Sequence, residues 1–192
     1  KFLNLKKDIQ IDFICEPKID GLSISLLYVN GNLFNAVTRG DGKVGEIVTD
    51  NVKTIKDIPH KLKGNYPDLI EIRGEIFMKK ANFEELNKSQ IEKNGKVFAN
   101  SRNAAAGSIR QKDINILKER KLNFYAFSVG EYTNDFNIKT QFDLLKKFEQ
   151  MGVNTNQENF RASRIEDIKK FYSLMVSKRN ELDYEIDGLV YK

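Results

Sequence analysis

The first candidate for chemistry is Lys18, in the stretch EPKIDG. A lysine amine is a good nucleophile only when it is neutral. Desolvation and nearby cations favour the neutral form, whereas the flanking carboxylates of Glu16 and Asp20 oppose it. A nucleophilic Lys18 therefore requires that these carboxylates face a metal ion or hydrogen-bond donors of a substrate. Pro17 fixes the backbone before the lysine, and Gly21 permits close approach of a ligand. The alternative is a surface lysine paired with its two acidic neighbours.

Two further clusters carry charged side chains in strand-like sequence. EIRGE supplies Glu71, Arg73 and Glu75, and a carboxylate beside a glycine is suited to holding ribose hydroxyls. YEIDGLVYK supplies Asp187 and Lys192. Each of these clusters alone is a weak signal of a functional site. The three together, KIDG, EIRGE and YEIDGLVYK in this order and each in a predicted strand, are a specific signal.

Other catalytic residue types are scarce. The chain has one cysteine, Cys15, and one histidine, His60. This excludes an internal disulfide, a paired-cysteine zinc site and a His-rich metal site. Cys15 is expected to be a buried, inert thiol and His60 a surface residue. Any chemistry must come from Lys, Arg, Asp and Glu.

Charge is unevenly distributed along the 192 residues, whose net charge is +5. The segment 93–121 holds eight basic and two acidic residues. This favours a polyanion as partner, with a solvated basic face as the alternative. Apolar runs such as 22–29 are too short to cross a bilayer, and no signal peptide opens the chain. We expect a cytoplasmic protein without a membrane partner. The first residue is not Met and the last run is apolar, so we expect a piece of a longer protein.

The elements that must position these residues begin with a strand over 11–21, where the alternation predicts one buried face. Asn30-Gly31, between strand-like runs, predicts a two-residue hairpin turn. That turn would pair Val29 with Asn32 and set Arg39 opposite Leu22, bringing Arg39 towards Lys18. A register slip of one residue would move Arg39 to the other face.

The remaining pattern mixes strands with helices. Further strands are predicted over 69–78, 122–130 and 184–192. Helices are predicted over 46–55, 80–93 with Asn82 as cap, 100–111 with caps Asn100 and Ser101, 141–152 closed by Gly152, and 164–182. Hairpins with connecting helices indicate an α+β class with antiparallel sheets. The loop RGDGKVG fits neither the Walker pattern nor the dinucleotide fingerprint, so a Rossmann fold is not favoured.

The chain resembles the adenylation domain of bacterial NAD-dependent DNA ligases, within the covalent nucleotidyltransferase superfamily. KIDG matches the nucleophile motif of that family. The other matching blocks are TRGDGKVGEIVTDNVKTIKDIP at 38–59, EIRGEIFM at 71–78, FANSRNAAAGSIRQKD at 98–113 and YEIDGLVYK at 184–192. The block at 98–113 is characteristic of the NAD-dependent branch. The resemblance implies a nucleotidyltransferase (ATP-grasp-like) fold, with antiparallel sheets and flanking helices, over 1–192.

The resemblance also implies roles for single residues. Lys18, in one motif with Asp20, would attack the α-phosphate of NAD and become lysyl-AMP. Lys192 would neutralise charge at that phosphate, and Asp187 would support it or a magnesium ion. The remaining roles are adenine recognition by Glu16 and Phe127, contacts to the ribose region by Arg39 and Glu75, and contacts to the DNA backbone by Arg102 and Arg110.

The implied partner is nicked double-stranded DNA, sealed in replication and repair, with NAD and magnesium as cofactors and no obligate protein partner. Leu189 and Tyr191 stand where smaller aliphatic residues are usual, and we expect packing changes only. Relative to the family, the chain is expected to be truncated at both ends. It would lack the nicotinamide-mononucleotide segment, the final lysine motif and the OB, zinc, helix-hairpin-helix and BRCT modules. Such a fragment would bind adenosine nucleotide without sealing nicks.

Three alternatives remain. An ATP-dependent ligase or RNA-capping enzyme would use ATP as the AMP donor. A Schiff-base enzyme using Lys18 would be trapped by borohydride with a carbonyl substrate. A non-catalytic nucleic-acid-binding module would rest on the basic segment 93–121, and Lys18→Ala would leave its activity untouched.

Overall fold

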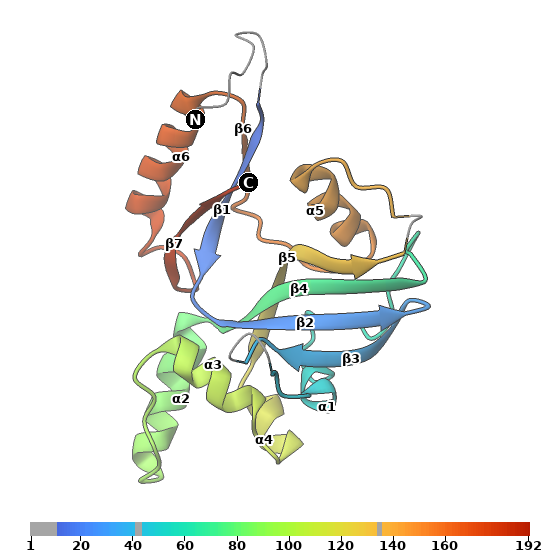
Figure 1. Ribbon diagram of the computed structural model, residues 1–192. Helices are drawn as coiled ribbons and strands as arrows, with labels where there is room; N and C mark the ends of the chain where they lie inside the picture. The colour runs from blue at the N-terminus through green and yellow to red at the C-terminus, as the bar shows by residue number, and fades with distance from the viewer. Residues whose placement is uncertain (1–10, 41–43, 134–135) are drawn as a thin grey trace.

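A computed structural model describes residues 11–40, 44–133 and 136–192. Within them the strands form two separate antiparallel sheets, one with the order β3-β2-β4-β5 and one with the order β6-β1-β7 (Figure 1). The strands are β1 (Phe13–Ile19), β2 (Leu22–Val29), β3 (Asn32–Thr38), β4 (Leu69–Met78), β5 (Leu122–Tyr132), β6 (Phe160–Ala162) and β7 (Ile186–Tyr191).

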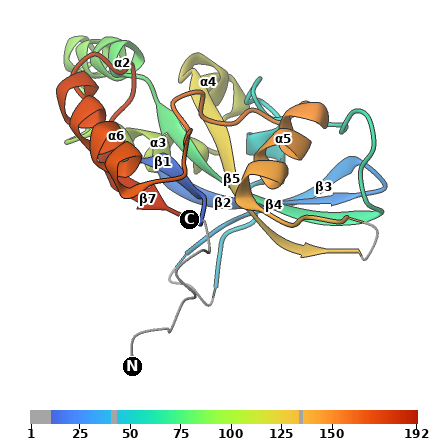
Figure 2. The same ribbon diagram turned by 90° about the horizontal axis from the view of Figure 1, so that it is seen from above.

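Helices flank both sheets. They are α1 (Thr49–Val52), α2 (Lys80–Glu92), α3 (Ser101–Ile109), α4 (Ile114–Glu119), α5 (Gln141–Gln150) and α6 (Ile165–Lys178). In the view from above, α6 lies beside the smaller sheet, and α5 lies next to β5 of the larger one (Figure 2). The mixed α+β class with antiparallel sheets is therefore confirmed. No helix within the described residues has the length and apolar composition needed to cross a lipid bilayer.

The larger sheet follows from alternation and one tight turn. Asn30 and Gly31 both have positive φ, at 48° and 73°, as the predicted two-residue hairpin requires. In β4 the isoleucines point to one face, which is fully buried, and the charged residues point to the other. The predicted split of this strand into an apolar and a charged face is confirmed.

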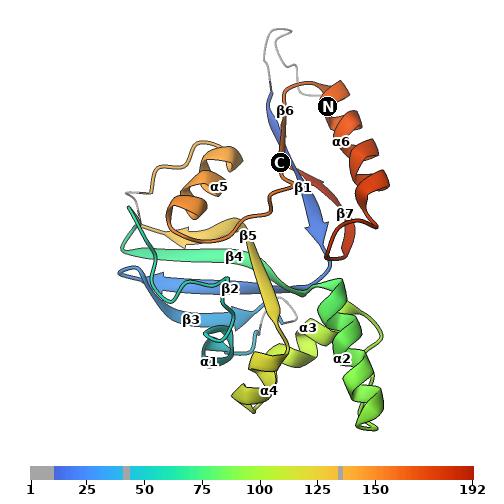
Figure 3. The same cartoon turned by 180° about the vertical axis from the view of Figure 1, so that it is seen from behind.

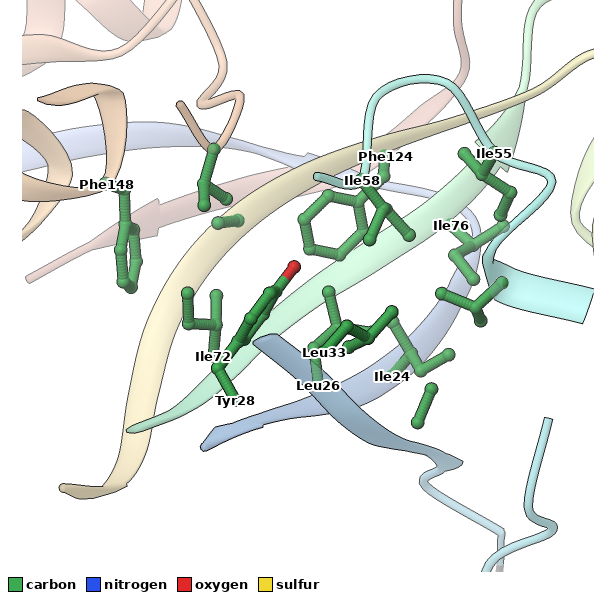
Figure 4. Close-up of a cluster of buried hydrophobic side chains, with 14 of the residues drawn as sticks. Ile24, Leu26, Tyr28, Leu33, Ile55, Ile58, Ile72, Ile76, Phe124 and Phe148 are labelled. Atoms are coloured by element: carbon green, nitrogen blue, oxygen red, sulfur yellow. The ribbon is translucent and has the colours of Figure 1, made fainter. Parts of the chain in front are cut away.

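The main core covers the apolar face of the larger sheet (Figure 4). Leu26 and Ile72 on adjacent strands are fully buried there, and Phe148 of α5 packs against the same cluster. The segment after α1 contributes Ile55 and Ile58. The opposite face of the sheet, which carries the charged side chains, is not covered by this core and lines cavities instead.

The smaller sheet is covered on both faces, which corrects the prediction of a single buried face for β1. Cys15 packs against Phe171 and Met175 of α6 on one side, and is a buried free thiol as expected. On the other side Ile14 and Glu16 are also buried, at 5% and 6% exposure. A period-two pattern marks which side chains share a face and does not show that the second face is open.

Helix ends were predicted with mixed success. Asn100 does cap α3, because its side chain accepts a hydrogen bond from the Asn103 N–H at 2.7 Å. Asn82 is not a cap: α2 begins after Lys79, and the Asn82 amide donates instead to the carbonyl of Lys121. The short elements β6 and α4 were not predicted, and part of the 39–46 loop lies outside the described residues.

Candidate active site

A cavity of about 300 Å³ lies between the two sheets. One wall comes from β1 and β7, and the other from β2, β4 and β5, with Arg102 of α3 between them. Figure 3 shows the two sheets meeting where β1 leads into β2. The predicted site residues that line this cavity are Glu16, Lys18, Arg39, Glu75, Arg102, Phe127 and Lys192.

Lys18 reaches into this cavity and meets Asp187. Its Nζ lies 2.7 Å from both carboxylate oxygens of Asp187. The Lys18 side chain is 54% exposed, so the ion pair adds little to stability. Its consequence is positional, because it holds the amine of Lys18 beside the carboxylate of Asp187. The two residues are brought together by the antiparallel pairing of β1 with β7.

A β-bulge turns Asp187 towards the lysine. Lys18 pairs with Gly188 and Ile19 pairs with Ile186, which leaves Asp187 without a residue opposite it. A bulge breaks the strict alternation and redirects one side chain. Gly188, directly across from Lys18, has open space where a Cβ would stand.

Glu16 is the buried carboxylate of the site and is held by two donors. Lys192 Nζ donates to its Oε2 at 2.9 Å, and Gln141 Nε2 donates to its Oε1 at 2.7 Å. The Lys192 amine also lies 5.4 Å from the centre of the Phe127 ring. Lys192 is fixed here because its backbone pairs with that of Ile14, two residues before Glu16 in β1.

Phe127 is itself the extra residue of a bulge in β5. Arg73 pairs with Ser128 and Gly74 with Ala126, so Phe127 has no partner across the ladder. Its carbonyl oxygen accepts hydrogen bonds from Lys192 at 2.8 Å and from Gln141 at 2.9 Å instead. The aromatic ring proposed to stack on a base therefore sits on a distorted segment of strand.

Arg39 lines the cavity, but not by the predicted register. Val29 does pair with Asn32, yet a bulge at Phe34 shifts the later pairs by one, and the Arg39 N–H donates to Ser23 instead of lying opposite Leu22. Leu22 packs against the main core, so the predicted register would have turned Arg39 away from the cavity. Arg39 and Lys18 line the same cavity, but the predicted register of the hairpin is wrong.

Glu75 is a half-buried carboxylate between the sheets. It accepts a hydrogen bond from Ser23 Oγ at 2.7 Å. Burial raises the pKa of Glu75 to about 7, and this outweighs the lowering by Ser23 and by the nearby charges of Arg102 and Lys18. Glu75 therefore changes charge near neutral pH.

The other two charged residues of EIRGE, Glu71 and Arg73, form an ion pair with each other. Arg73 donates from Nε to Glu71 at 2.8 Å, and Ser25 Oγ also donates to Glu71 at 2.5 Å. These bonds, that from Arg73 foremost, lower the pKa of Glu71 to about 2. The pair lies on an adjacent polar cavity along the same sheet face, so only Glu75 of this motif reaches the Lys18 cavity.

Gly21 and Gly74 were predicted to let a ligand approach closely, but both are required by packing within the chain. A Cβ on Gly21 would lie 2.3 Å from the carbonyl oxygen of Ile76 in β4. A Cβ on Gly74 would lie 2.3 Å from the Phe124 ring in the core. Both positions require glycine because another part of the chain occupies the space.

The two predicted DNA-contacting arginines are placed differently. Arg102 lies in the first turn of α3, 3.3 Å from Asp20, and lines the cavity. Arg110 follows the last residue of α3 and pairs with Glu46, outside the cavity lining. Within the described residues, no three acidic, cysteine or histidine side chains gather as a metal cluster.

Gln141 and Ser23 are site residues that the sequence analysis missed. Ser23 belongs to the predicted second strand, and Gln141 starts a predicted helix directly after the residue whose side chain caps it, Thr140. The alternation of β2 sets Ser23 on the face opposite to the buried Ile24, which was an available signal. No local pattern points Gln141 towards Glu16.

The chain is similar to proteins of one kind over its whole length. A model of the NAD-dependent DNA ligase adenylation domain matches residues 2–192. The relatives include proteins named DNA ligase from Afipia carboxidovorans, Hyphomonas neptunium and Bradyrhizobium sp., which are 48%, 47% and 49% identical. Each match covers 100% of this chain, and the chain spans 27% of the length of each relative.

Proposed function

The chain belongs to the NAD-dependent DNA ligase adenylation domain family, and from this premise we propose that Lys18 takes AMP from NAD. The observation that carries the proposal is the shared cavity, where Lys18 of β1, Glu75 of β4 and Lys192, which follows β7, lie together. A cationic clamp around a transferring phosphate stabilises the charge that develops there. Lys192, Arg39 and Arg102 are the cations lining the cavity that would form such a clamp beside Lys18.

In the proposed step the neutral amine of Lys18 attacks the α-phosphate of NAD. A phosphorus–nitrogen bond forms, and the bond from the α-phosphorus to the bridging oxygen breaks. Nicotinamide mononucleotide leaves with that electron pair, and the amine loses a proton. Asp187, 2.7 Å from Nζ, is the nearest acceptor for this proton. Lys192 would move from Glu16 to the phosphate and balance its charge.

The rest of the cavity would bind the nucleoside. Glu16 would accept a hydrogen bond from the adenine edge, and Phe127 would stack on the ring. Glu75 and Arg39 would contact the ribose region, and Asp20 would hold Arg102 at the edge of the site. The fold implied by this reaction is the nucleotidyltransferase (ATP-grasp-like) fold.

Magnesium forms part of the proposal through Asp187. Mg²⁺ usually binds one or two carboxylates together with substrate phosphates, so it needs no cage of protein ligands. Asp187 is the carboxylate at Lys18 that fits this role. When bound, the ion would neutralise charge on the phosphates.

The adenylated domain would act within a longer protein. AMP would pass from Lys18 to the 5′-phosphate of nicked DNA, and sealing would follow in replication and repair. This chain alone would bind adenosine nucleotide. Arg102 and Arg110 would contact the DNA backbone near the site.

The nucleophile is tested by Lys18→Ala in the intact protein. We expect incubation with NAD to add one AMP to the wild type and none to the variant, since the other amine that lines the cavity, that of Lys192, is paired with Glu16. Mass spectrometry of the protein reads this directly. An AMP adduct that persists on Lys18→Ala would defeat the assignment. Adduct formation with ATP but not NAD would indicate an ATP-dependent enzyme, and borohydride trapping of a carbonyl compound without any adduct would indicate Schiff-base chemistry.

The DNA contact is tested by Arg102→Ala. We expect weaker binding of nicked duplex with AMP transfer largely retained, because the guanidinium contributes to phosphate binding. The slope of log affinity against log salt concentration should fall by about 1. Equal loss of DNA binding and AMP transfer would instead assign Arg102 to the nucleotide site, where it meets Asp20.

A further inference from the structure

The basic segment 93–121, which predicted a polyanion as partner, is only partly accounted for by the proposed site. Within the described residues, ion pairs engage three of its eight basic side chains, those of Arg102, Arg110 and Lys121. Lys93 and Lys96, the first two of the eight, form no ion pair with any described residue, and both are exposed. A lysine without a partner on the protein is available to bind a phosphate.

Helix α2, which leads to these two lysines, projects from the molecule. None of its 13 residues is buried, and Figures 1 and 3 show it pointing away from both sheets. Phe83 and Leu86, both in its first half, pack against the main core. An α-helix of this length is about 20 Å long. Its end and the segment after it, residues 88–97, therefore form a tip that extends away from the core.

The backbone of this tip is ordered by its own hydrogen bonds. Asn94 has a positive φ of 52°, and its N–H donates to the Ile91 carbonyl at 3.1 Å. The N–H of Gly95 donates to the Gln90 carbonyl at 2.7 Å. These two bonds and the positive φ form a Schellman motif, which ends a helix in a fixed turn. The Gln90 side chain also donates to the Lys96 carbonyl, at 3.0 Å.

The chain beyond the tip is tied back to α2. The Asn87 side chain exchanges two hydrogen bonds of 2.9 Å with the backbone of Phe98, one donated and one accepted. Phe98 in turn packs against the main core. Lys93 and Lys96 are therefore attached to a fixed backbone, at a set distance from Arg102 at the start of α3.

The side chains of the tip combine positive charge with exposed apolar surface. The tip carries three lysines and one acidic residue, Glu92. Ile91 and Val97 are 64% and 48% exposed. Proteins hold a duplex through basic contacts to its phosphates, and apolar side chains can enter the minor groove beside them. The charge and the apolar side chains of the tip together fit the edge of a duplex groove.

We propose that the tip of α2 is a second contact to nicked DNA. Lys93 and Lys96 would bind backbone phosphates, and Ile91 and Val97 would contact the groove beside them. This inference rests on the proposed function, which places the nick at the Lys18 cavity. It adds the duplex beside the nick to what the adenylation domain recognises.

The length of α2 determines where on the DNA this contact lies. The helix begins at Lys80, shortly after Glu75, which lines the cavity. Its tip is therefore on the order of 20 Å from the cavity, and base pairs are about 3.4 Å apart along the duplex. The contact thus lies about six base pairs from the nick.

The charged contact is tested in the intact protein with the double variant Lys93→Gln/Lys96→Gln. Binding of a nicked duplex, with arms of about one helical turn each, is measured by fluorescence anisotropy at several salt concentrations. The slope of log affinity against log salt concentration should fall by about 2, and affinity at about 0.1 M salt should fall about tenfold. AMP adduct formation from NAD should be unchanged, because neither lysine lines the cavity.

Lys169→Gln/Lys170→Gln in α6 is the matched control. These two lysines are also exposed and without an ion pair among the described residues, and α6 lies beside the smaller sheet (Figure 2). The control removes the same charge, so any general effect of net charge on DNA binding appears in it as well. Its salt slope should equal that of the wild type.

Shortening the DNA tests the position of the contact. One arm of the duplex is cut to about four base pairs, on each side of the nick in turn, which is less than the reach of α2. One of the two shortened duplexes should bind Lys93→Gln/Lys96→Gln and the wild type equally well. Ile91→Ser/Val97→Ser should weaken binding of the full duplex about threefold without changing the salt slope, because no phosphate contact is lost.

An unchanged salt slope in Lys93→Gln/Lys96→Gln, or a reduction matched by the α6 control, would overturn the inference. So would a difference that persists on both shortened duplexes, since the lysines would then contact DNA elsewhere. In each case the proposed function still stands if the wild type forms the AMP adduct on Lys18. Absence of that adduct in the wild type would remove the proposed function itself.

Discussion

The pKa of Glu75 is controlled by the burial of its carboxyl group between the two sheets. Burial raises its pKa to about 7 from a value of 4.5. A carboxyl with a raised pKa binds its proton more tightly in the folded chain. Its stabilising contribution is therefore complete below pH 4.5 and is lost as the pH rises to about 7. Above that range the folded chain holds a half-buried negative charge.

Glu75→Gln should therefore stabilise the chain at pH 8. We expect the free energy of unfolding to rise by at most about 3 kcal/mol at pH 8, because the charged form is absent. The variant should equal the wild type within error at pH 4.5. Urea unfolding at both pH values measures this. AMP affinity should fall in the same variant, since the carboxylate is proposed to contact ribose.

Glu71→Gln on the same strand provides the opposite control. The pKa of Glu71 is lowered to about 2, chiefly by its hydrogen bond from Arg73. Its contribution is present above pH 4.5 and is lost as the pH falls towards 2. The substitution should therefore destabilise the chain at pH 8. If both variants shift stability in the same direction at pH 8, burial does not control Glu75.

At the scale of the element, three bulges place the site. They set Asp187 beside Lys18, free the Phe127 carbonyl, and shift the pairing of β3 with β2 by one residue at Phe34. The three motifs contain Lys18, Glu75, Asp187 and Lys192 of the site, whereas Ser23 and Gln141 lie outside them and were not predicted. The directions of the side chains were not predictable either, because alternation assumes an unbroken register and a bulge leaves no periodic signal.

Deleting Phe34 should leave the site in place. Phe34 is the residue skipped between the pairs Tyr28–Leu33 and Leu27–Asn35, so its removal straightens β3 and still leaves Arg39 at Ser23. The Phe34 side chain is 68% exposed, so no core contact is lost. We expect AMP affinity and the free energy of unfolding to change by less than about 1 kcal/mol, as calorimetry and urea unfolding would measure. A larger loss of AMP affinity would show that the bulge itself, and not only the register, positions Arg39.

The start of a helix, too, could be predicted only in part from the sequence. Asn100 and Asn82 are equally good cap residues by type, yet only Asn100 caps a helix. The chain leaves β4 directly into α2, so that helix starts two residues before Asn82. Local propensity identifies the candidate cap residues, and the tertiary course of the chain determines which of them begins a helix.

At the scale of the whole molecule, the fold class and most strands followed from sequence, whereas the division into two sheets did not. One antiparallel hairpin identifies β2 and β3 as neighbours in the larger sheet. The smaller sheet joins β1 to β6 and β7 from the far end of the sequence, and no local pattern reports such pairs. The cavity is lined by both sheets, and Gly21 lies in the short link between β1 of one sheet and β2 of the other.

Gly21→Ala should disturb both sheets. Its new Cβ would lie 2.3 Å from the backbone oxygen of Ile76, so the strand connection must shift. We expect a loss of stability of about 1–3 kcal/mol together with weaker AMP binding. Gly188→Ala is the matched control, because no atom lies within 4 Å of the added Cβ, and stability should be unchanged. Thermal unfolding separates the two. Equal stability of both variants would show that the contact at Gly21 relaxes without cost.

The pairing of β1 with β7 also fixes when the site can arise during synthesis. Lys18 and Asp187 are 169 positions apart, and Glu16 and Lys192 are 176 apart. Translation produces Lys18 early and Asp187 only near the end of the 192 residues. The nascent chain therefore contains all four strands of the larger sheet before it contains β7. A stop codon shortly before residue 186 would give a product that keeps those four strands and lacks both Asp187 and Lys192.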